Sequence, residues 1–290
     1  MAKKTSNENW IISKMRKLYY LLTPSMRLSV RYLLYFPIDF VEGLIGKKDD
    51  MVPPKRLIFI GSGDFKTQGN RLLKLIIDKT ALEPTHRILD VGCGIGRLAL
   101  PLTKYLDNEG SYEGFDIVKQ GIDWCNKKIA IKYPNFNFLH IDLKNKLYNL
   151  NTDTKAENFI FPYEENSFDR VLLTSVFTHM LPADIENYLH QIQRVLKKDG
   201  KCFATFFIFN DKTLEMMKNG MSKFNFTHDF GSYRLFDKKV EEANIAFDEK
   251  YLLDLLLENN LKIESISYGW WSRNQEDAIS DFQDIVVFSK

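Results

Sequence analysis

Three glycines stand at alternate positions, Gly92, Gly94 and Gly96, directly after a short apolar run. Glycine adopts positive φ and lets the backbone approach a ligand closely, so a strand that ends in such a loop is typical of nucleotide or nucleoside binding. A dinucleotide loop would need glycine or alanine where the chain has Arg97. Asp90, two residues before the first glycine, would repel a pyrophosphate and suit a cationic amino-acid group. The loop therefore favours a ligand without phosphates.

Two more carboxylates follow the next two predicted strands. Asp116 comes directly after the predicted strand 111–115, where a carboxylate can accept both ribose hydroxyls of a nucleoside. Asp142 follows the predicted strand 136–140, where it can accept from an adenine amino group. Any one of these acids is an ordinary strand terminus. Together with the glycine loop, they predict a nucleoside site.

Helix and strand signals alternate from residue 55 onward, as apolar spacing and short β-branched runs indicate. Predicted helices cover 70–80, 97–106, 119–133, 184–198 and 248–258, and predicted strands cover 87–91, 111–115, 136–140, 170–174, 202–209, 262–268 and 284–289. We expect residues 197–200, Lys-Lys-Asp-Gly, to close the helix 184–198. Alternation predicts an α/β fold with a doubly wound, mostly parallel sheet, whose ligands bind beyond the carboxyl ends of the strands. No helical pattern separates the last two strands, so an antiparallel strand is expected at the sheet edge.

At these positions the sequence resembles the class I S-adenosylmethionine-dependent methyltransferases, of the bacterial small-molecule type. Five segments within residues 85–209 are similar to that family's motifs: ILDVGCGIGR (88–97), Phe115-Asp116, His140-Ile141-Asp142, NSFDRVLL (166–173) and LKKDGK (196–201). The resemblance implies an enzyme with a Rossmann-like sheet of seven strands, the last one antiparallel. It also implies S-adenosylmethionine as cofactor and S-adenosylhomocysteine as product.

The resemblance assigns roles to individual residues. Asp90, Gly92 and Gly94 would lie along the methionine part, with Asp90 reaching the ammonium through backbone or water, while Asp116 would hold the ribose and Asp142 the adenine amino group. The cofactor-binding residues that it implies are Asp90, Gly92, Cys93, Gly94, Gly96, Asp116, Ile117, Asp142, Leu143 and Thr174. FIGSGDF (59–65), FTHMLP (177–182) and YGWW (268–271) are similar to one bacterial subgroup, whose motifs do not fix the substrate.

The catalytic base is less well defined. His179 follows the fourth strand, in the loop where the methyl acceptor should arrive, and imidazole titrates near neutral pH. It is our candidate catalytic residue, although a histidine there can equally cap a turn or fill the core. Weaker candidates are His228, Tyr163, Asp64 and Asp184. Residues 173–177, Leu-Thr-Ser-Val-Phe, lack the Asn/Asp-Pro-Pro-Tyr/Phe motif of adenine- and amide-directed N-methyltransferases, so transfer to oxygen is favoured.

Composition narrows the classes of partner. The chain has 290 residues, 40 Lys+Arg and 38 Asp+Glu, and its three cysteines are too few and too widely spaced for a disulfide framework, which suits the cytoplasm. Residues 51–290 are net acidic, so nucleic acid is not expected as a partner. We expect no bound metal. The predicted function is methyl transfer to a small-molecule or glycan-type acceptor, while the oligomeric state stays open.

The N-terminal segment differs from the rest of the chain. Residues 1–50 carry nine Lys/Arg and five Asp/Glu, and we predict basic amphipathic helices in 8–45, broken near Pro24 and Pro37. Neither a signal peptide nor a membrane span is expected. We divide the chain into an extension, 1–52, and a methyltransferase domain, 53–290, with 210–247 as a substrate cap.

Two interpretations of the extension remain open. It packs over the main domain, or it makes a peripheral contact with an anionic membrane surface. The alternative function that follows from the second interpretation is a catalytically silent cofactor-binding protein that docks on a membrane or a partner.

Overall fold

The computed structural model describes residues 22–44, 46, 49–59, 63–272 and 281–290. They form two units. Helix α2 (Pro24–Leu44) and the short helix η1 (Lys55–Leu57) belong to the smaller unit, whereas residues 63–290 hold both sheets of the larger one. The division differs from the predicted boundary after residue 52, because residues 53–61 belong with α2 in the smaller unit, whereas residues 50–52 belong to the larger one.

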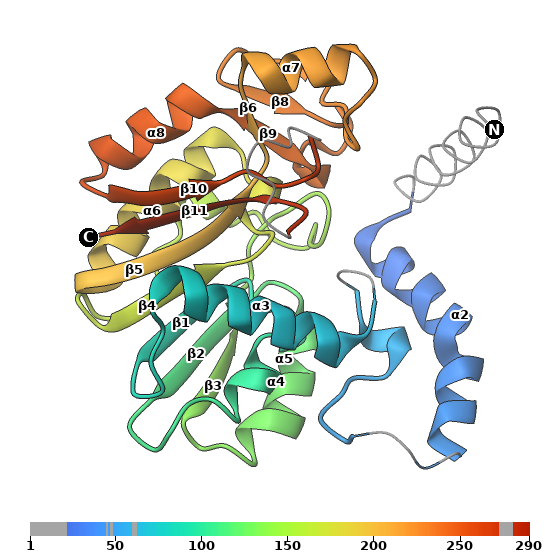
Figure 1. Ribbon diagram of the computed structural model, residues 1–290. Helices are drawn as coiled ribbons and strands as arrows, with labels where there is room; N and C mark the ends of the chain where they lie inside the picture. The colour runs from blue at the N-terminus through green and yellow to red at the C-terminus, as the bar shows by residue number, and fades with distance from the viewer. Residues whose placement is uncertain (1–21, 45, 47–48, 60–62, 273–280) are drawn as a thin grey trace. The chain divides into compact units, whose positions relative to one another are not determined.

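The larger unit is built on a seven-stranded sheet with the order β10-β11-β5-β4-β1-β2-β3 (Figure 1). Its strands are β1 (Arg87–Val91), β2 (Ser111–Asp116), β3 (Phe136–His140), β4 (Phe168–Leu173), β5 (Leu196–Phe206), β10 (Lys262–Ser267) and β11 (Asp284–Ser289). The last strand, β11, is antiparallel to both of its neighbours, and β1 to β5 are parallel. The predicted doubly wound, mostly parallel sheet is thus confirmed.

The position of the antiparallel strand differs from the prediction. Strand β11 lies between β5 and β10, so the edge strand is β10. Every residue of β11 is buried, as an inner strand requires. β10 returns through helix α8 (Glu249–Glu258) and so runs parallel to β5, which leaves the space between them for the final strand.

Alternate residues of the strands face two separate hydrophobic layers. Leu89 and Val91 of β1 pack with α6 (Pro182–Val195) and α8, whereas Ile88 packs with α3 (Phe65–Thr80), α4 (Ala99–Leu102) and α5 (Lys119–Cys125). This alternation is what a strand covered by helices on both faces must show. Helix α3 begins five residues earlier than predicted, and Asp64 caps it by accepting from the backbone N–H of Thr67 at 2.8 Å.

Several helix ends also differ from the sequence prediction. Only α4 and a few turns form within 97–106, and α5 passes at residue 126 into a π-helical turn, η2 (Asn126–Ala130). Helix α6 ends at Val195, so residues 197–200 do not close it as predicted. They belong to the start of β5, where Asp199 takes a left-handed φ of 63° and the register with β4 shifts.

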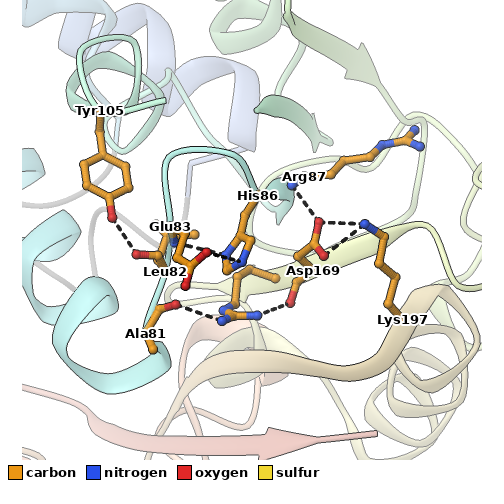
Figure 2. Close-up of polar contacts among 9 residues, drawn as sticks. Ala81, Leu82, Glu83, His86, Arg87, Tyr105, Asp169 and Lys197 are labelled. Carbon is orange, nitrogen blue, oxygen red and sulfur yellow. Dashed lines mark hydrogen bonds and ion pairs between the residues drawn. The ribbon is translucent and has the colours of Figure 1, made fainter. Parts of the chain in front are cut away.

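Lys197 has a tertiary partner instead. Its ammonium donates to both oxygens of Asp169, which also accepts from the backbone N–H of Arg87 at 2.9 Å (Figure 2). The guanidinium of Arg170 donates to the carbonyl oxygen of Ala81, in the turn after α3, at 2.9 Å. This cluster joins the amino ends of β1 and β4 and so holds the end of the sheet that lies away from the glycine loop.

Residues 207–248 form a second, smaller sheet with the order β6-β9-β8-β7. Its elements are β6 (Ile208–Phe209), α7 (Asp211–Lys218), β7 (His228–Asp229), β8 (Tyr233–Leu235), η5 (Glu241–Ala243) and β9 (Ile245–Asp248). Phe207, Phe226 and Trp271 are buried together in its core, and the Trp271 indole N–H donates to Asp284 at 2.7 Å. These aromatic rings therefore stabilise the insert, while Phe230 and Trp270 remain exposed.

Helix α2 runs without interruption through Pro37, where the sequence predicted a break. Pro37 removes one hydrogen bond, to the carbonyl of Leu33, and both residues are exposed, so water can satisfy that carbonyl. Pro24 is the first residue of the helix, a position that tolerates proline. The helix predicted before Pro24 lies outside the described residues. Among the helices that are described, none has the length and hydropathy of a membrane span.

Candidate functional site

The glycine loop is joined to the carboxyl end of β2. The backbone N–H groups of Gly92 and Cys93 both donate to the carbonyl oxygen of Phe115, at 2.8 and 3.0 Å. Gly92 has a φ of 73°, and a Cβ there would stand 2.5 Å from Cγ2 of Val176. Only glycine therefore permits this turn and this approach.

Asp116 lies in the same place because the loop holds it. One carboxylate oxygen accepts from the N–H of Gly94 at 2.8 Å, and the other accepts from the N–H of Val118 at 2.7 Å. Burial raises the pKa of Asp116 to about 6, although these hydrogen bonds act in the opposite direction. Each oxygen keeps a second lone pair, so the carboxylate can still accept from a ligand hydroxyl.

Asp90 has the most informative environment of the three acids. Its Oδ2 accepts from the Tyr112 hydroxyl at 2.7 Å, whereas its buried Oδ1 has no hydrogen-bond partner among the residues that the structure describes. Burial raises the pKa of Asp90 to about 7. A buried oxygen without a partner is rare and needs an explanation. A cationic or N–H donor in the loop would supply one, so this site fits the ammonium end of an amino-acid ligand.

The other predicted cofactor residues occupy different environments. Asp142 is exposed after β3 and accepts from the Asn149 side chain at 2.7 Å. Ile117 and Thr174 are half-buried at the ends of β2 and β4, and Leu143 is buried. Gly96 has no side chain to offer a ligand, and the thiol of Cys93 is buried.

The reason differs between these two positions. Gly96 has a φ of 77° and fits against Cys125 and Ile129, so a Cβ there would stand 2.8 Å from the Cys125 sulfur. The Cys93 thiol is buried against Gly114, and burial raises its pKa. Only the backbone of Cys93 can take part in binding.

His179 lies on a short helix, η4 (Phe177–His179), directly after β4. Its Nδ1 is 2.7 Å from the carbonyl oxygen of Glu242 in the insert, and since a carbonyl only accepts, Nδ1 carries the proton. Burial lowers the pKa of His179 below its usual 6.5. The ring is therefore neutral at pH 7, with its basic lone pair on Nε2. It stands nearly perpendicular to the Tyr148 ring, with 5.9 Å between the two ring centroids.

The weaker catalytic candidates have structural partners. Asp64 caps α3, and Asp184 caps α6 by accepting from the N–H of Leu181 at 3.1 Å. Tyr163 packs edge-on against Phe168, and burial raises its pKa. His228 pairs with Leu235 in the small sheet.

Sequence reasoning missed a group of polar residues at the carboxyl end of β4. Ser175 has a left-handed φ of 60°, which is uncommon for serine, and its N–H donates to the Thr205 hydroxyl at 2.7 Å. Both hydroxyls donate to Oε1 of Gln283, at 2.9 and 2.8 Å. No sequence pattern links Ser175 and Thr205 to Gln283, because these residues are far apart in the chain. Ser175 does lie in the segment 173–177, which the sequence analysis used to judge the acceptor atom.

Comparison with known proteins agrees with this geometry. Residues 88–200 match the sequence profile of the family described as "Methyltransferase domain". The chain is 27% identical over 119 residues to tRNA N(3)-cytidine methyltransferase METTL2 of Bos taurus, which covers 40% of this chain and 28% of the relative. It is 24% identical over 128 residues to 2-phytyl-1,4-naphtoquinone methyltransferase of Nostoc sp., which covers 44% of this chain and 49% of the relative.

A solved structure shows the same fold. The PH0226 protein of Pyrococcus horikoshii has a TM-score of 0.52 and 16% identity over 80% of this chain and 94% of its own. The chain spans at most about half the length of the two curated relatives, so the similarity concerns this domain and not their whole activities. The matched segment contains β1 with its glycine loop, β2 with Asp116, and β4. The chain therefore carries a class I methyltransferase domain of the S-adenosylmethionine-dependent type.

Proposed function

We propose that this protein transfers the methyl group of S-adenosylmethionine to an oxygen atom of a small-molecule or glycan-type acceptor. The observation that carries the proposal is the unpartnered buried oxygen of Asp90, beside a glycine loop that also holds Asp116. A cationic amino-acid group and a ribose are the two ligand parts that these carboxylates fit. The cofactor, when bound, supplies an electrophilic methyl group on a sulfonium and needs no acid from the protein.

The chain's own residues then orient the reactants. Asp116 would hold the ribose hydroxyls, and Asp90 would hold the amino-acid end, while Asp142 would accept from the adenine amino group. With these three parts of the cofactor held, the position of its methyl group relative to the end of β4 would be fixed. Such positioning contributes about 7–11 kcal/mol to the barrier reduction of well-oriented reactions.

His179 is the proposed general base. Its Nδ1 proton is held by the carbonyl of Glu242, so Nε2 can accept a proton from an acceptor hydroxyl. Because the pKa of His179 is lowered by burial, the base stays unprotonated at pH 7 and is lost only at acidic pH. General bases of this kind contribute roughly 10²–10⁴-fold to the rate.

Two features support the class of acceptor. Residues 51–290 carry more acidic than basic side chains, which favours a small molecule over a polyanionic RNA. Trp270 follows the end of β10 and packs against the Phe282 ring at 4.6 Å between centroids, yet 45% of its surface is exposed, so part of its indole is open to stacking on a flat or sugar-like acceptor. The named substrates of the two relatives, a tRNA cytidine and a naphthoquinone, differ too widely to settle the acceptor.

The first experiment is calorimetric titration of the purified protein with S-adenosylmethionine and S-adenosylhomocysteine, with NAD as the control ligand. We expect micromolar binding of both and none of NAD. Asp116→Ala should weaken cofactor binding at least fivefold. Asp123→Ala is the matched control, because Asp123 is exposed on α5, where it pairs with Lys119 on the same helix. Equal affinity of the Asp116 variant and the control would refute the ribose assignment.

Transfer of a labelled methyl group then tests the reaction. Small-molecule extracts, glycans and total RNA serve as separate acceptor pools, and incorporation into RNA alone would overturn the acceptor class. With an acceptor in hand, His179→Gln should lower kcat by about 100-fold or more. It should also abolish the fall of kcat at acidic pH and leave the affinity for the cofactor unchanged. Cofactor binding without transfer in any pool would favour the alternative function, a silent cofactor-binding protein.

A further inference from the structure

Helix α2 exposes an unusual amount of apolar surface. Of the eighteen large hydrophobic residues that are exposed among the described residues, ten lie on this one helix. They are Met26, Val30, Tyr32, Leu33, Leu34, Phe36, Ile38, Phe40, Val41 and Leu44. Leu33 and Leu44 each have 73% of their surface exposed. Contiguous apolar surface of this kind marks an interaction site.

The apolar residues lie on one side of the helix. At about 100° per residue, the positions from Phe36 round to Leu34 span an arc of about 160° that contains no charged residue. The eight large residues of this arc, which we call the apolar arc, are Met26, Val30, Leu33, Leu34, Phe36, Phe40, Val41 and Leu44. The four charged residues of the helix, two arginines and two acids, lie on the opposite side.

The opposite side already has its partner within the same unit. Asp39 is buried and accepts from the backbone N–H groups of Lys55 and Arg56, at 2.7 and 3.0 Å, and Lys55 pairs with Glu42. The Arg56 guanidinium lies 5.2 Å from the ring centroid of Tyr32. Both acids of α2 are thus neutralised by η1, and the described residues of this unit leave the apolar arc exposed.

The net positive charge of the residues around the apolar arc indicates what kind of partner covers it. Lys55, Arg56 and the arginines of α2 outnumber its two acids, and residues 1–21 add five Lys/Arg against one Glu. Two copies of so basic a segment repel each other. The other eight exposed hydrophobic residues of the described chain lie on eight different elements or loops of the larger unit, whereas ten gather on α2 alone.

We propose that α2 lies in the surface of an anionic lipid bilayer, with the apolar arc inserted among the acyl chains and with Arg31, Lys55 and Arg56 at the headgroups. An amphipathic helix that combines a wide apolar face with flanking cations binds such a surface through two contributions, burial of its apolar area and attraction of its cations to anionic headgroups. The proposal rests on the smaller unit and does not depend on methyl transfer.

Vesicle co-sedimentation of the full-length protein tests this. Phosphatidylcholine vesicles with 30% phosphatidylglycerol should pellet most of the protein, and pure phosphatidylcholine vesicles should pellet at least fivefold less. Leu33→Glu combined with Phe40→Glu, both in the apolar arc, should lower partitioning at least tenfold. Leu257→Glu is the matched control, since Leu257 is 61% exposed on α8, and it should pellet like the wild type.

Equal pelleting of the double variant and the control, or no pelleting of the wild type, would overturn the proposal. Size-exclusion chromatography with light scattering, without lipid, tests whether a second copy of this chain covers the apolar arc instead. A wild-type dimer that the double variant dissociates would assign the apolar arc to a second copy. Calorimetric cofactor binding by both variants shows that the larger unit is intact, so failure here is separable from failure of the proposed enzymatic function.

Discussion

Replacement of Asp90 by asparagine should stabilise the protein, and the gain should depend on pH. The unfolded carboxyl group ionises near pH 3.8, whereas burial raises the folded pKa to about 7. The folded state therefore resists ionisation throughout this range, and the wild type loses stability as pH rises from about 4 to about 7. Three pKa units correspond to about 4 kcal/mol at 1.36 kcal/mol per unit. Asparagine keeps the size and an acceptor for the Tyr112 hydroxyl but carries no charge.

Urea denaturation of both proteins at pH 4, 5.5 and 8 measures this difference. We expect the free energies of unfolding to agree within about 0.5 kcal/mol at pH 4, with Asp90→Asn more stable by about 2 kcal/mol at pH 5.5 and by about 4 kcal/mol at pH 8. Asp123→Asn is the control, because Asp123 is exposed and its removal should change stability by less than about 0.5 kcal/mol at each pH. A pH-independent difference for the Asp90 variant would refute the reasoning, since its only source is the buried charge.

The same substitution should weaken cofactor binding. A cationic group next to Asp90 would lower its pKa on binding, so the wild type should release protons at pH 6 and bind more tightly as pH rises toward 7. Titration in two buffers of different ionisation enthalpy counts these protons. The variant should release fewer protons and bind at least fivefold less tightly, and unchanged proton release would show that the ligand does not reach this carboxylate.

Three further substitutions test local geometry. Gly92→Ala would place a Cβ 2.5 Å from Val176 at a φ of 73°, so cofactor affinity should fall at least tenfold by calorimetry; an unchanged affinity would mean that the loop can reshape. Ala81→Gly should raise stability by about 0.5–1 kcal/mol in thermal unfolding, because the residue caps α3 at a φ of 51°, and a lower Tm would contradict this. Asp169→Asn should cost about 1 kcal/mol at pH 7 in urea denaturation. Burial raises the pKa of Asp169, but the hydrogen bonds from Lys197 and the Arg87 N–H lower it by more, so the folded pKa lies below the ordinary 3.8. The loss should therefore shrink as the pH falls below 3.8, and a loss that stays unchanged there would exclude the ion pair as its source.

The sequence predicted an element correctly where the contacts that fix its structure come from residues nearby in the chain. Strands β1 and β3 have the predicted bounds, because β1 is a short buried run that ends at the glycine loop and β3 alternates buried phenylalanines with exposed residues. Asp248 caps α8 as predicted, since an N-cap acts on N–H groups two or three residues away. The glycine loop and its order after β1 also follow from local chemistry.

Prediction failed where a distant contact competes with local preference. Residues 197–200 read as a helix end, but Asp169, from the neighbouring strand, binds Lys197 and the chain enters β5 instead. Pro37 read as a break, but the hydrogen bond that it removes lies on the exposed side of α2, where the loss costs little. The position of β11 in the sheet depends on which other strands have an edge left to pair with. The sequence of β11 alone does not show which strands those are.

By itself, the sequence determined the fold class, the glycine loop and the three acids at the ends of the first three strands, because each depends on residue types at short spacing. Only the tertiary structure decided that Asp90 keeps a buried oxygen without a partner and that Glu242 holds the proton of His179. Likewise, only the fold joins Ser175 to Gln283. These properties arise from burial and from contacts between residues up to 108 positions apart, and desolvation acts on a carboxylate only once the chain has closed around it.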